Sequence, residues 1–175
     1  DTGFFVPPES AARLAPTSNA RASVIEAPET SPFLKEPGLL SGGGGLVSTA
    51  RDFTTFALML ANGGEWNGKR FLKRATVEAM TTNQLPGALV PIRFGPLPMA
   101  GTGFGFGVAV RVEEGGPHRP VGEWGWGGAA STTFFVSPKD ELLVVSLIQR
   151  MPMWKGLDDA IRPLVYGAIL QPAGR

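Results

Sequence analysis

The sequence predicts an α+β protein, because strand-like and helix-like patterns occupy separate stretches of its 175 residues. Residues 131–136 are rich in β-branched and aromatic side chains, and residues 142–148 are almost wholly apolar. Apolar residues recur at helical spacing after Thr49 and again after Asp158. We therefore expect an antiparallel sheet with a C-terminal helix packed on one face.

The two strand-like runs lie in the stretch from Val121 to Arg150, around which we expect the rest of the chain to be organised. Between them stands Ser137-Pro138-Lys139-Asp140, a cluster of turn formers, so the runs predict an antiparallel hairpin. The second run is apolar almost without interruption, which is typical of a strand buried on both faces. We therefore expect it at the centre of the sheet.

The clearest helix follows the glycine-rich residues 41–45. Thr49 and Asp52 match a variant of the capping box, in which the Asp carboxylate reaches back to a free backbone N–H. Asn62-Gly63-Gly64 should end this helix. The glycine run lacks the dinucleotide and P-loop fingerprints, so we do not expect it to bind phosphate. The expected apolar face consists of Phe53, Phe56, Ala57 and Leu60.

Weaker patterns predict the remaining elements. Residues 1–40 contain several prolines and no sustained period, and we expect an extended arm that wraps around the domain. Asn67-Gly68 predicts a tight turn, and a second helix is expected from Thr76 to Gln84. Residues 85–103 predict a long loop. A half-buried strand is expected over 104–112, with Phe104, Phe106, Val108, Val110 and Val112 on one face.

The C-terminal helix is expected to begin near Asp158-Asp159, with Pro163 as a kink or a new first turn. Its spacing places one apolar side toward the sheet. That side consists of Leu157, Ala160, Ile161, Leu164, Ala168 and Ile169.

Composition narrows the classes of function. The net charge is +1, there is no cysteine, and His118 is the single histidine. We therefore expect no nucleic-acid partner, no metal and no other cofactor. No apolar run approaches the roughly 18 residues of a membrane helix, so we expect no membrane partner. Residues 1–175 are expected to form one domain or part of one, and the missing initiator Met suggests that the chain begins within a longer protein.

A complete hydrolase site is not predicted within the chain. His118 lies between prolines and glycines in a turn, where we expect it to face solvent, and no serine stands in a G-x-S-x-G elbow. None of the five lysines has a serine three positions before it, as Ser-Lys chemistry on one helical turn requires. Tyr166 falls in the C-terminal helix, where core packing is the default. We expect the isolated chain to be inactive.

The segment from Trp124 to Ala130 allows two interpretations. Two tryptophans alternate with residues that have little or no side chain, which allows close approach by another backbone or by a ligand. In the structural interpretation, the tryptophans only fill the edge of the core beside a glycine bulge. In the functional interpretation, the segment borders a substrate pocket.

Three blocks of the sequence, in the same order and over almost the whole chain, resemble the C-terminal half of the serine β-lactamase superfamily. The resemblance is nearest to class C β-lactamases and closer still to their esterase relatives, the family VIII carboxylesterases. The blocks are GGGGLVSTARDFTTFALMLANGGEWNGKRFLKRATVEAM, GFGFGVAVRV and WGWGGAASTTFFVSPKDELLVVSLIQR.

This resemblance implies the C-terminal portion of the β-lactamase and penicillin-binding-protein fold. The family's Ser-x-x-Lys nucleophile and catalytic Tyr lie in an N-terminal half that this chain lacks. Where the family has Lys-Thr-Gly on the strand beside the active site, this sequence has Trp126-Gly127-Gly128. The resemblance makes these three residues substrate-binding, and makes the backbone N–H of Ala129 an oxyanion-hole donor.

The resemblance implies a serine carboxylesterase that cleaves short-chain acyl esters through an acyl-enzyme. Trp126 is neutral where the β-lactamases carry a cation, which favours neutral esters over carboxylate-bearing lactams. The expected partners are a small ester or lactam and a complementary N-terminal segment that carries Ser-x-x-Lys and Tyr. A β-lactamase or D-amino-acid peptidase is one alternative, and a non-catalytic fragment or binding module is another.

Overall fold

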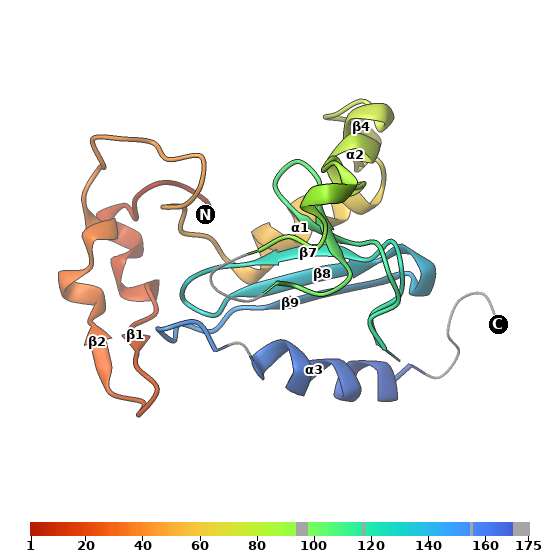
Figure 1. Ribbon diagram of the computed structural model, residues 1–175. Helices are drawn as coiled ribbons and strands as arrows, with labels where there is room; N and C mark the ends of the chain where they lie inside the picture. Colours follow the sequence, from red (N-terminus) through yellow and green to blue (C-terminus); the bar gives the residue numbers. More distant parts are fainter. Residues whose placement is uncertain (94–97, 117, 155, 170–175) are drawn as a thin grey trace.

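The computed structural model describes residues 1–93, 98–116, 118–154 and 156–169. A five-stranded antiparallel sheet forms its centre, with α1 and α2 on one side and α3 on the other (Figure 1). The fold is therefore α+β, as the sequence predicts. Its strands are β5 (Thr102–Phe104), β6 (Ala109–Arg111), β7 (Trp124–Gly127), β8 (Thr133–Ser137) and β9 (Leu142–Ser146), and its helices are α1 (Ala50–Ala61), α2 (Arg74–Thr81) and α3 (Gly156–Gly167).

The predicted central hairpin is confirmed. β8 and β9 pair antiparallel from Thr133 opposite Ser146 to Ser137 opposite Leu142. A short 3-10 turn, Pro138–Asp140, joins them, and Glu141 closes it in the left-handed conformation at φ 51°. The cluster of turn formers thus reverses the chain where the sequence predicts.

The expected single strand over 104–112 is wrong, because these residues form the turn and second strand of a hairpin. Phe104 ends β5 and pairs with Ala109 of β6. Phe106 stands at the turn with 58% of its surface exposed. Gly107, which follows it, has φ +92°, a conformation that few side chains tolerate. Glycines at alternate positions look like the polar face of a strand, but here they bend the chain.

The position of β9 also differs from the prediction. Among the described residues it is an edge strand, because β8 is its only partner in the sheet. All five of its residues are half-buried rather than buried. α1 packs against β9. Covering one face and one edge is not enough to bury an apolar strand completely.

The first helix begins as predicted, since the Thr49 hydroxyl accepts the Asp52 N–H at 3.1 Å. The Asp52 carboxylate, however, does not reach back to the helix start. It accepts from the Thr2 hydroxyl at 3.0 Å and pairs with the amino group of Asp1. Of the expected apolar face, Ala57 and Leu60 are buried, whereas Phe56 is 46% exposed.

A single core forms between the sheet and the first two helices. Within it, the Phe134 ring contacts two other rings edge to face. The centroid distance is 5.0 Å to Phe53 and 6.0 Å to Trp124. The second helix starts two residues before the predicted Thr76 and ends at Thr81, with Val77 buried. The buried cluster comprises Ala57, Leu60, Val77, Val108, Val110, Trp124, Phe134 and Val136.

The tight turn at Asn67-Gly68 is confirmed, with φ of 49° and 73°. It joins two short strands, β3 (Glu65–Trp66) and β4 (Lys69–Arg70). The preceding helix stop at 62–64 is also confirmed, since the Gly64 N–H donates to the Met59 carbonyl at 2.9 Å in left-handed backbone.

The buried side of α3 is not the one that the sequence predicts. Arg162 is only 4% exposed, whereas Leu164 is 75% exposed. Ala160 and Ala168 are exposed as well, and Leu157 is the one member of the predicted face that is fully buried. Arg162 faces the sheet because it pairs there with the buried carboxylate of Glu123, just before β7.

The first forty residues form a separate layer at one end of the sheet (Figure 1). They include a small antiparallel pair, β1 (Thr17–Ser18) and β2 (Val24–Glu26). Ser18 binds the segment after β9 by two backbone hydrogen bonds of 2.8 Å, to Gln149 and Met151. Within the described residues, no helix is long and apolar enough to cross a membrane.

Candidate active site

The four predicted site residues lie at one end of the sheet. Trp126 and Gly127 are the last residues of β7 and pair with Phe134 and Thr133 of β8. Gly128 and Ala129 begin the turn that follows. β7 is therefore a regular strand rather than a bulge, and its end presents the predicted motif as one continuous segment.

The Trp126 indole packs inside the fold rather than projecting into solvent. Its ring meets Phe104 edge to face, with centroids 5.0 Å apart and planes at 87°. It also packs against the buried cluster, and the residue remains half-buried. The indole thus has a structural role, and part of its surface remains accessible.

The glycines of this segment are partly a packing requirement. A Cβ at Gly125 would collide with the backbone of Phe134, and one at Gly128 would collide with the Thr132 hydroxyl. At Gly127 the nearest atom is 3.2 Å away, which is tight but less severe. Close approach of β8 accounts for Gly125, and close approach of Thr132, the residue before β8, accounts for Gly128, without any ligand.

Ala129 is exposed at the head of the turn. The turn is closed by Ser131 N–H donating to the Gly128 carbonyl at 3.0 Å and by Gly128 N–H donating to Thr132 at 2.8 Å. Within the described part of the chain, the Ala129 N–H donates to no other group. It is therefore available to an acceptor outside the chain.

Ser131, which sequence reasoning missed, fixes this turn. It has φ 64° and is 3% exposed. Its hydroxyl donates to the Arg150 carbonyl and accepts the Trp154 N–H, both at 2.8 Å. A buried serine in left-handed backbone holds the turn against the segment that leads into α3. A serine after two alanines gives no sequence signal for this role.

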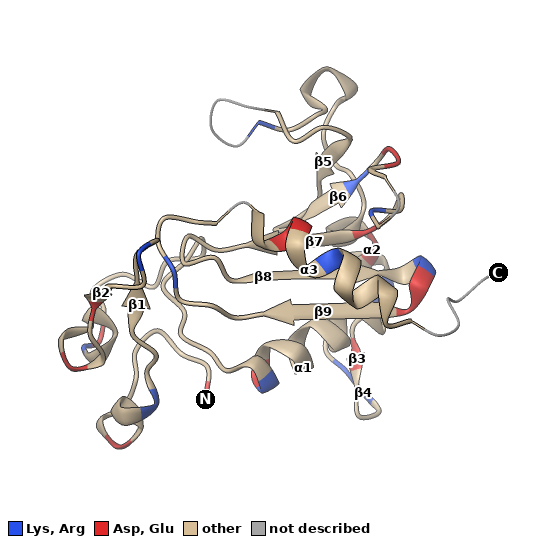
Figure 2. Ribbon diagram, turned by 90° about the horizontal axis from the view of Figure 1, so that it is seen from below, with Lys and Arg blue, Asp and Glu red and all other residues tan. Residues whose placement is uncertain are grey.

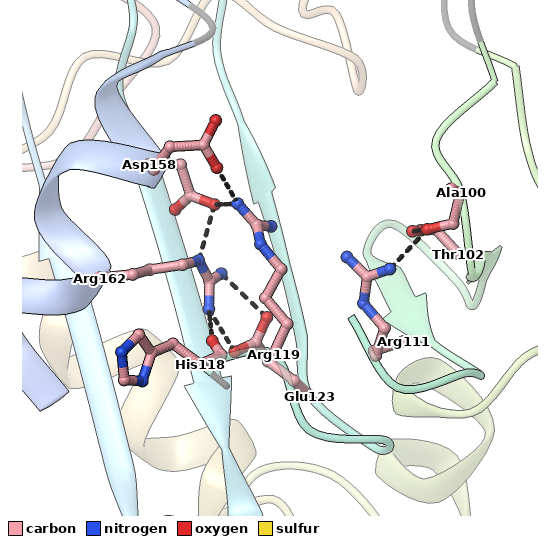
Figure 3. A network of polar contacts seen from close by, with 9 residues as sticks. Ala100, Thr102, Arg111, His118, Arg119, Glu123, Asp158 and Arg162 are labelled. Carbon is pink, nitrogen blue, oxygen red and sulfur yellow. Dashed lines mark hydrogen bonds and ion pairs between the residues drawn. The ribbon is translucent and has the colours of Figure 1, made fainter. Parts of the chain in front are cut away.

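A polar network occupies the α3 face of the sheet (Figures 2 and 3). Arg162 donates to both carboxylate oxygens of Glu123, at 2.6 and 2.9 Å, and to the His118 carbonyl at 2.8 Å. It also pairs with Asp158 at 2.8 Å, and its guanidinium lies 3.8 Å from the Phe135 ring centroid. Burial works against its charge, but the bonds to Glu123 and Asp158 outweigh burial and raise the pKa of Arg162.

The network extends to the start of α3 and corrects one expectation. Arg119 pairs with Asp158 and Asp159 at 3.0 and 2.6 Å. His118 is half-buried rather than solvent-facing, and its ring stacks on Tyr166 at 4.7 Å. The Tyr166 hydroxyl in turn donates to Asp140 at 3.2 Å. These residues fasten α3 to the sheet, so we assign them no catalytic role.

A cavity of about 440 Å³ opens beside this network. Gly125 and Gly127 line it, together with Arg111 and the side chains of Met99 and Met153. Trp126 is among its lining residues and Ala129 is not, although alternation along β7 directs the Trp126 side chain toward the buried cluster on the opposite face. The cavity and the predicted oxyanion position are therefore different places. No cluster that could hold a metal ion occurs in the described ranges.

The sheet, its flanking helices and the order of the elements define a fold that comparison with known proteins identifies. The Beta-lactamase family model matches residues 1–167, so the chain belongs to this family. Two curated relatives from Mycobacterium tuberculosis, the uncharacterized protein MT1414 (strain CDC 1551) and protein Rv1367c (strain H37Rv), are each 32% identical over 165 residues. The match covers 87% of this chain and 40% of each relative.

Solved structures show the same fold. The LovD6 mutant of simvastatin synthase from Aspergillus terreus has a TM-score of 0.73 at 22% identity, covering 93% of this chain and 44% of that one. EstCE1, a hydrolase with promiscuous acyltransferase activity, has a TM-score of 0.73 at 24% identity, covering 95% and 46%. A penicillin-binding protein homolog from Caulobacter crescentus has a TM-score of 0.60 at 18% identity, covering 97% and 48%.

Proposed function

We propose that this chain is part of a serine hydrolase that cleaves short-chain acyl esters through an acyl-enzyme. One observation carries the proposal. A neutral indole, Trp126, stands at the end of β7, and three residues later the Ala129 N–H makes no hydrogen bond within the described part of the chain. A nucleophilic serine and its base would come from outside these 175 residues. The chain would supply one wall of the acyl pocket and one oxyanion-hole donor.

The chemistry follows from these two groups. When a serine attacks an ester carbonyl, the carbonyl oxygen becomes an anion that needs donors already aimed at it. The Ala129 N–H lies in a turn that two backbone hydrogen bonds close, which limits the reorganisation needed before it can donate. Loss of one such donor typically lowers kcat about 10²–10³-fold. The indole offers apolar contact to the acyl group and no charge to attract a carboxylate.

Two further observations support the proposal. The sequence resembles the family VIII carboxylesterases, which are hydrolases of this kind. The structural neighbour EstCE1 is described as a hydrolase with promiscuous acyltransferase activity. The chain spans less than half the length of the relatives it matches, which agrees with a nucleophile located elsewhere in a longer protein. The apolar edge strand β9 is a natural place for a complementary segment to pair.

The test compares two substrate classes on the longer protein. We expect p-nitrophenyl acetate or butyrate to be hydrolysed with a higher kcat/KM than a chromogenic cephalosporin. Preferential turnover of the cephalosporin would support the β-lactamase alternative, and turnover of neither would leave the binding module. The isolated chain, incubated with a fluorophosphonate serine probe, should remain unlabelled. Stable labelling of any of its serines would contradict the proposed division of the site.

A further inference from the structure

Ser131 adopts a backbone conformation that glycine normally occupies. It ends the turn before β8 in left-handed backbone, at φ 64°. Tight turns between antiparallel strands usually place glycine at such a position, because a side chain there is strained. The other described non-glycine residues with positive φ, Ala22, Asn67 and Glu141, are exposed, whereas Ser131 is 3% exposed. A buried serine in this conformation therefore needs stabilising contacts of its own.

The Ser131 hydroxyl makes these contacts with a single segment. It donates to the Arg150 carbonyl and accepts the Trp154 N–H, both at 2.8 Å. The Arg150 N–H in turn donates to the Ala130 carbonyl at 3.0 Å. The residues on either side of Arg150 are hydrogen-bonded to Ser18 of the N-terminal layer, so this segment is itself held in place. The turn is thus fixed to a part of the fold that is anchored independently of it.

The Ser131 N–H determines where the Ala129 N–H points. The Gly128 carbonyl and the Ala129 N–H belong to one planar trans peptide, so they point in opposite directions. Because the Ser131 N–H donates to this carbonyl at 3.0 Å, the carbonyl is directed into the turn and the Ala129 N–H away from it. Glycine at position 128 offers little resistance to rotation of the peptide. Without the bond to Ser131, the peptide would be free to turn and present its carbonyl instead.

We propose that Ser131 is a positioning residue for the oxyanion-hole donor. Its hydroxyl anchors residue 131 in left-handed backbone, and its N–H then holds the Gly128–Ala129 peptide with the Ala129 N–H directed outward. Ser131 itself does not touch the substrate. This role rests on the proposed function, in which the Ala129 N–H donates to the oxyanion. A donor aimed in advance stabilises the transition state more than the bound ester, so loss of the hydroxyl should lower kcat rather than substrate affinity.

The Ser131→Gly variant of the longer protein tests this role. Glycine accepts φ 64° without strain, so the substitution removes the two hydroxyl contacts and leaves the backbone conformation accessible. We expect kcat for p-nitrophenyl butyrate to fall about 10- to 100-fold, with KM changed less than about twofold. An alkyl trifluoromethyl ketone forms an adduct with a catalytic serine that carries an oxyanion. Its Ki should rise by the same factor by which kcat/KM falls.

Ser137→Ala is the matched control. Ser137 is 0% exposed, and its hydroxyl donates to the Asp140 carboxylate at 2.7 Å. It is the last residue of β8, at the end of the strand away from the Ala129 turn. Removing this hydroxyl should lower stability in urea unfolding. It should leave kcat and the Ki of the ketone within about twofold of the unsubstituted values.

Two results would overturn the positioning role while the unsubstituted protein remains an active esterase. One is a folded Ser131→Gly variant whose kcat is unchanged, and the other is a fall in kcat that Ser137→Ala reproduces. If Ser131→Gly does not fold, a crystal structure of the unsubstituted protein with the ketone decides the matter. The role requires the Ala129 nitrogen within about 3.2 Å of the adduct oxygen, with the Gly128 carbonyl still bonded to Ser131. An unsubstituted protein that neither hydrolyses the ester nor forms the adduct would remove the proposed function and this role together.

Discussion

Arg162 and Glu123 form a two-point ion pair whose side chains are only 5% and 7% exposed. The pair joins α3 to the start of β7, and Arg162 additionally covers the Phe135 ring. Each charge is tolerated in the interior because the other is present. The pair therefore determines how α3 sits on the sheet.

Replacing one partner should be costly. We expect Glu123→Gln to lower the free energy of unfolding by about 3–5 kcal/mol, because it leaves the Arg162 charge buried with a weaker acceptor. Urea unfolding measures this change. The matched control is Glu65→Gln, since the Glu65–Arg70 pair is 44% exposed on both sides and should be worth at most about 1 kcal/mol. Equal effects of the two substitutions would show that the buried pair contributes nothing special.

Tyr166 should titrate late. Burial, followed by the nearby Asp140 carboxylate, raises the pKa of Tyr166 from 10.0 to about 12. The folded protein therefore holds this proton more tightly than the unfolded chain does, so stability from this group is present below pH 10 and is lost as pH rises from about 10 to about 12. Tyr166 is the only tyrosine in the 175 residues, so absorbance at 295 nm reports it alone. Tyr166→Phe should abolish the signal. A midpoint near 10 in the folded chain would refute the assignment.

The β5–β6 hairpin, found where the sequence predicts a single strand, depends on Gly105. A Cβ at this position would overlap the Met80 carbonyl oxygen, and backbone cannot move aside as a flexible side chain can. We expect Gly105→Ala to destabilise the protein by about 1–3 kcal/mol. Gly87→Ala is the control, because no atom lies within 4 Å of the added Cβ and φ is not positive there. The comparison uses thermal or urea unfolding, and similar stabilities would argue against the hairpin.

Trp126 should influence substrate choice in the longer protein. Trp126→Lys restores the cation of the β-lactamase pattern, and an ion pair at about 4 Å near a protein surface is worth roughly 4 kcal/mol before desolvation. A surviving gain of about 1.4 kcal/mol would shift the ratio of kcat/KM for cephalosporin over ester tenfold toward the lactam. The substitution also removes the ring contact with Phe104, which should lower the stability of the protein. Both kcat/KM values must therefore be measured on the same folded sample. An unchanged ratio in folded protein would make Trp126 a packing residue.

The sequence predicts the caps, turns and hairpins of this fold better than it predicts which side chains are buried. The Thr49 cap, the Asn67-Gly68 turn and the β8–β9 hairpin follow from short-range chemistry, and all three are present. Burial is a tertiary property and was harder to predict. Nothing in the spacing of α3 indicates that Arg162 faces inward, because its partner Glu123 lies 39 residues away.

The candidate site divides in the same way. The segment from Trp126 to Ala129 could be placed at a strand end from sequence and resemblance. The Ser131 anchor could not, because it depends on which distant groups approach its hydroxyl. Whether Trp126-Gly127-Gly128 and Ala129 contact substrate remains a prediction for the experiments above.

Each strand of the five-stranded sheet pairs with the strand that follows it in the chain. Sheets built in this way close by short loops, so forming each ladder loses little chain entropy. The contact order of the sheet is therefore low, and low contact order accompanies fast folding. We expect the sheet to assemble hairpin by hairpin as its residues leave the ribosome. The packing of α1 on β9, which spans about eighty residues of sequence, would then be a late step.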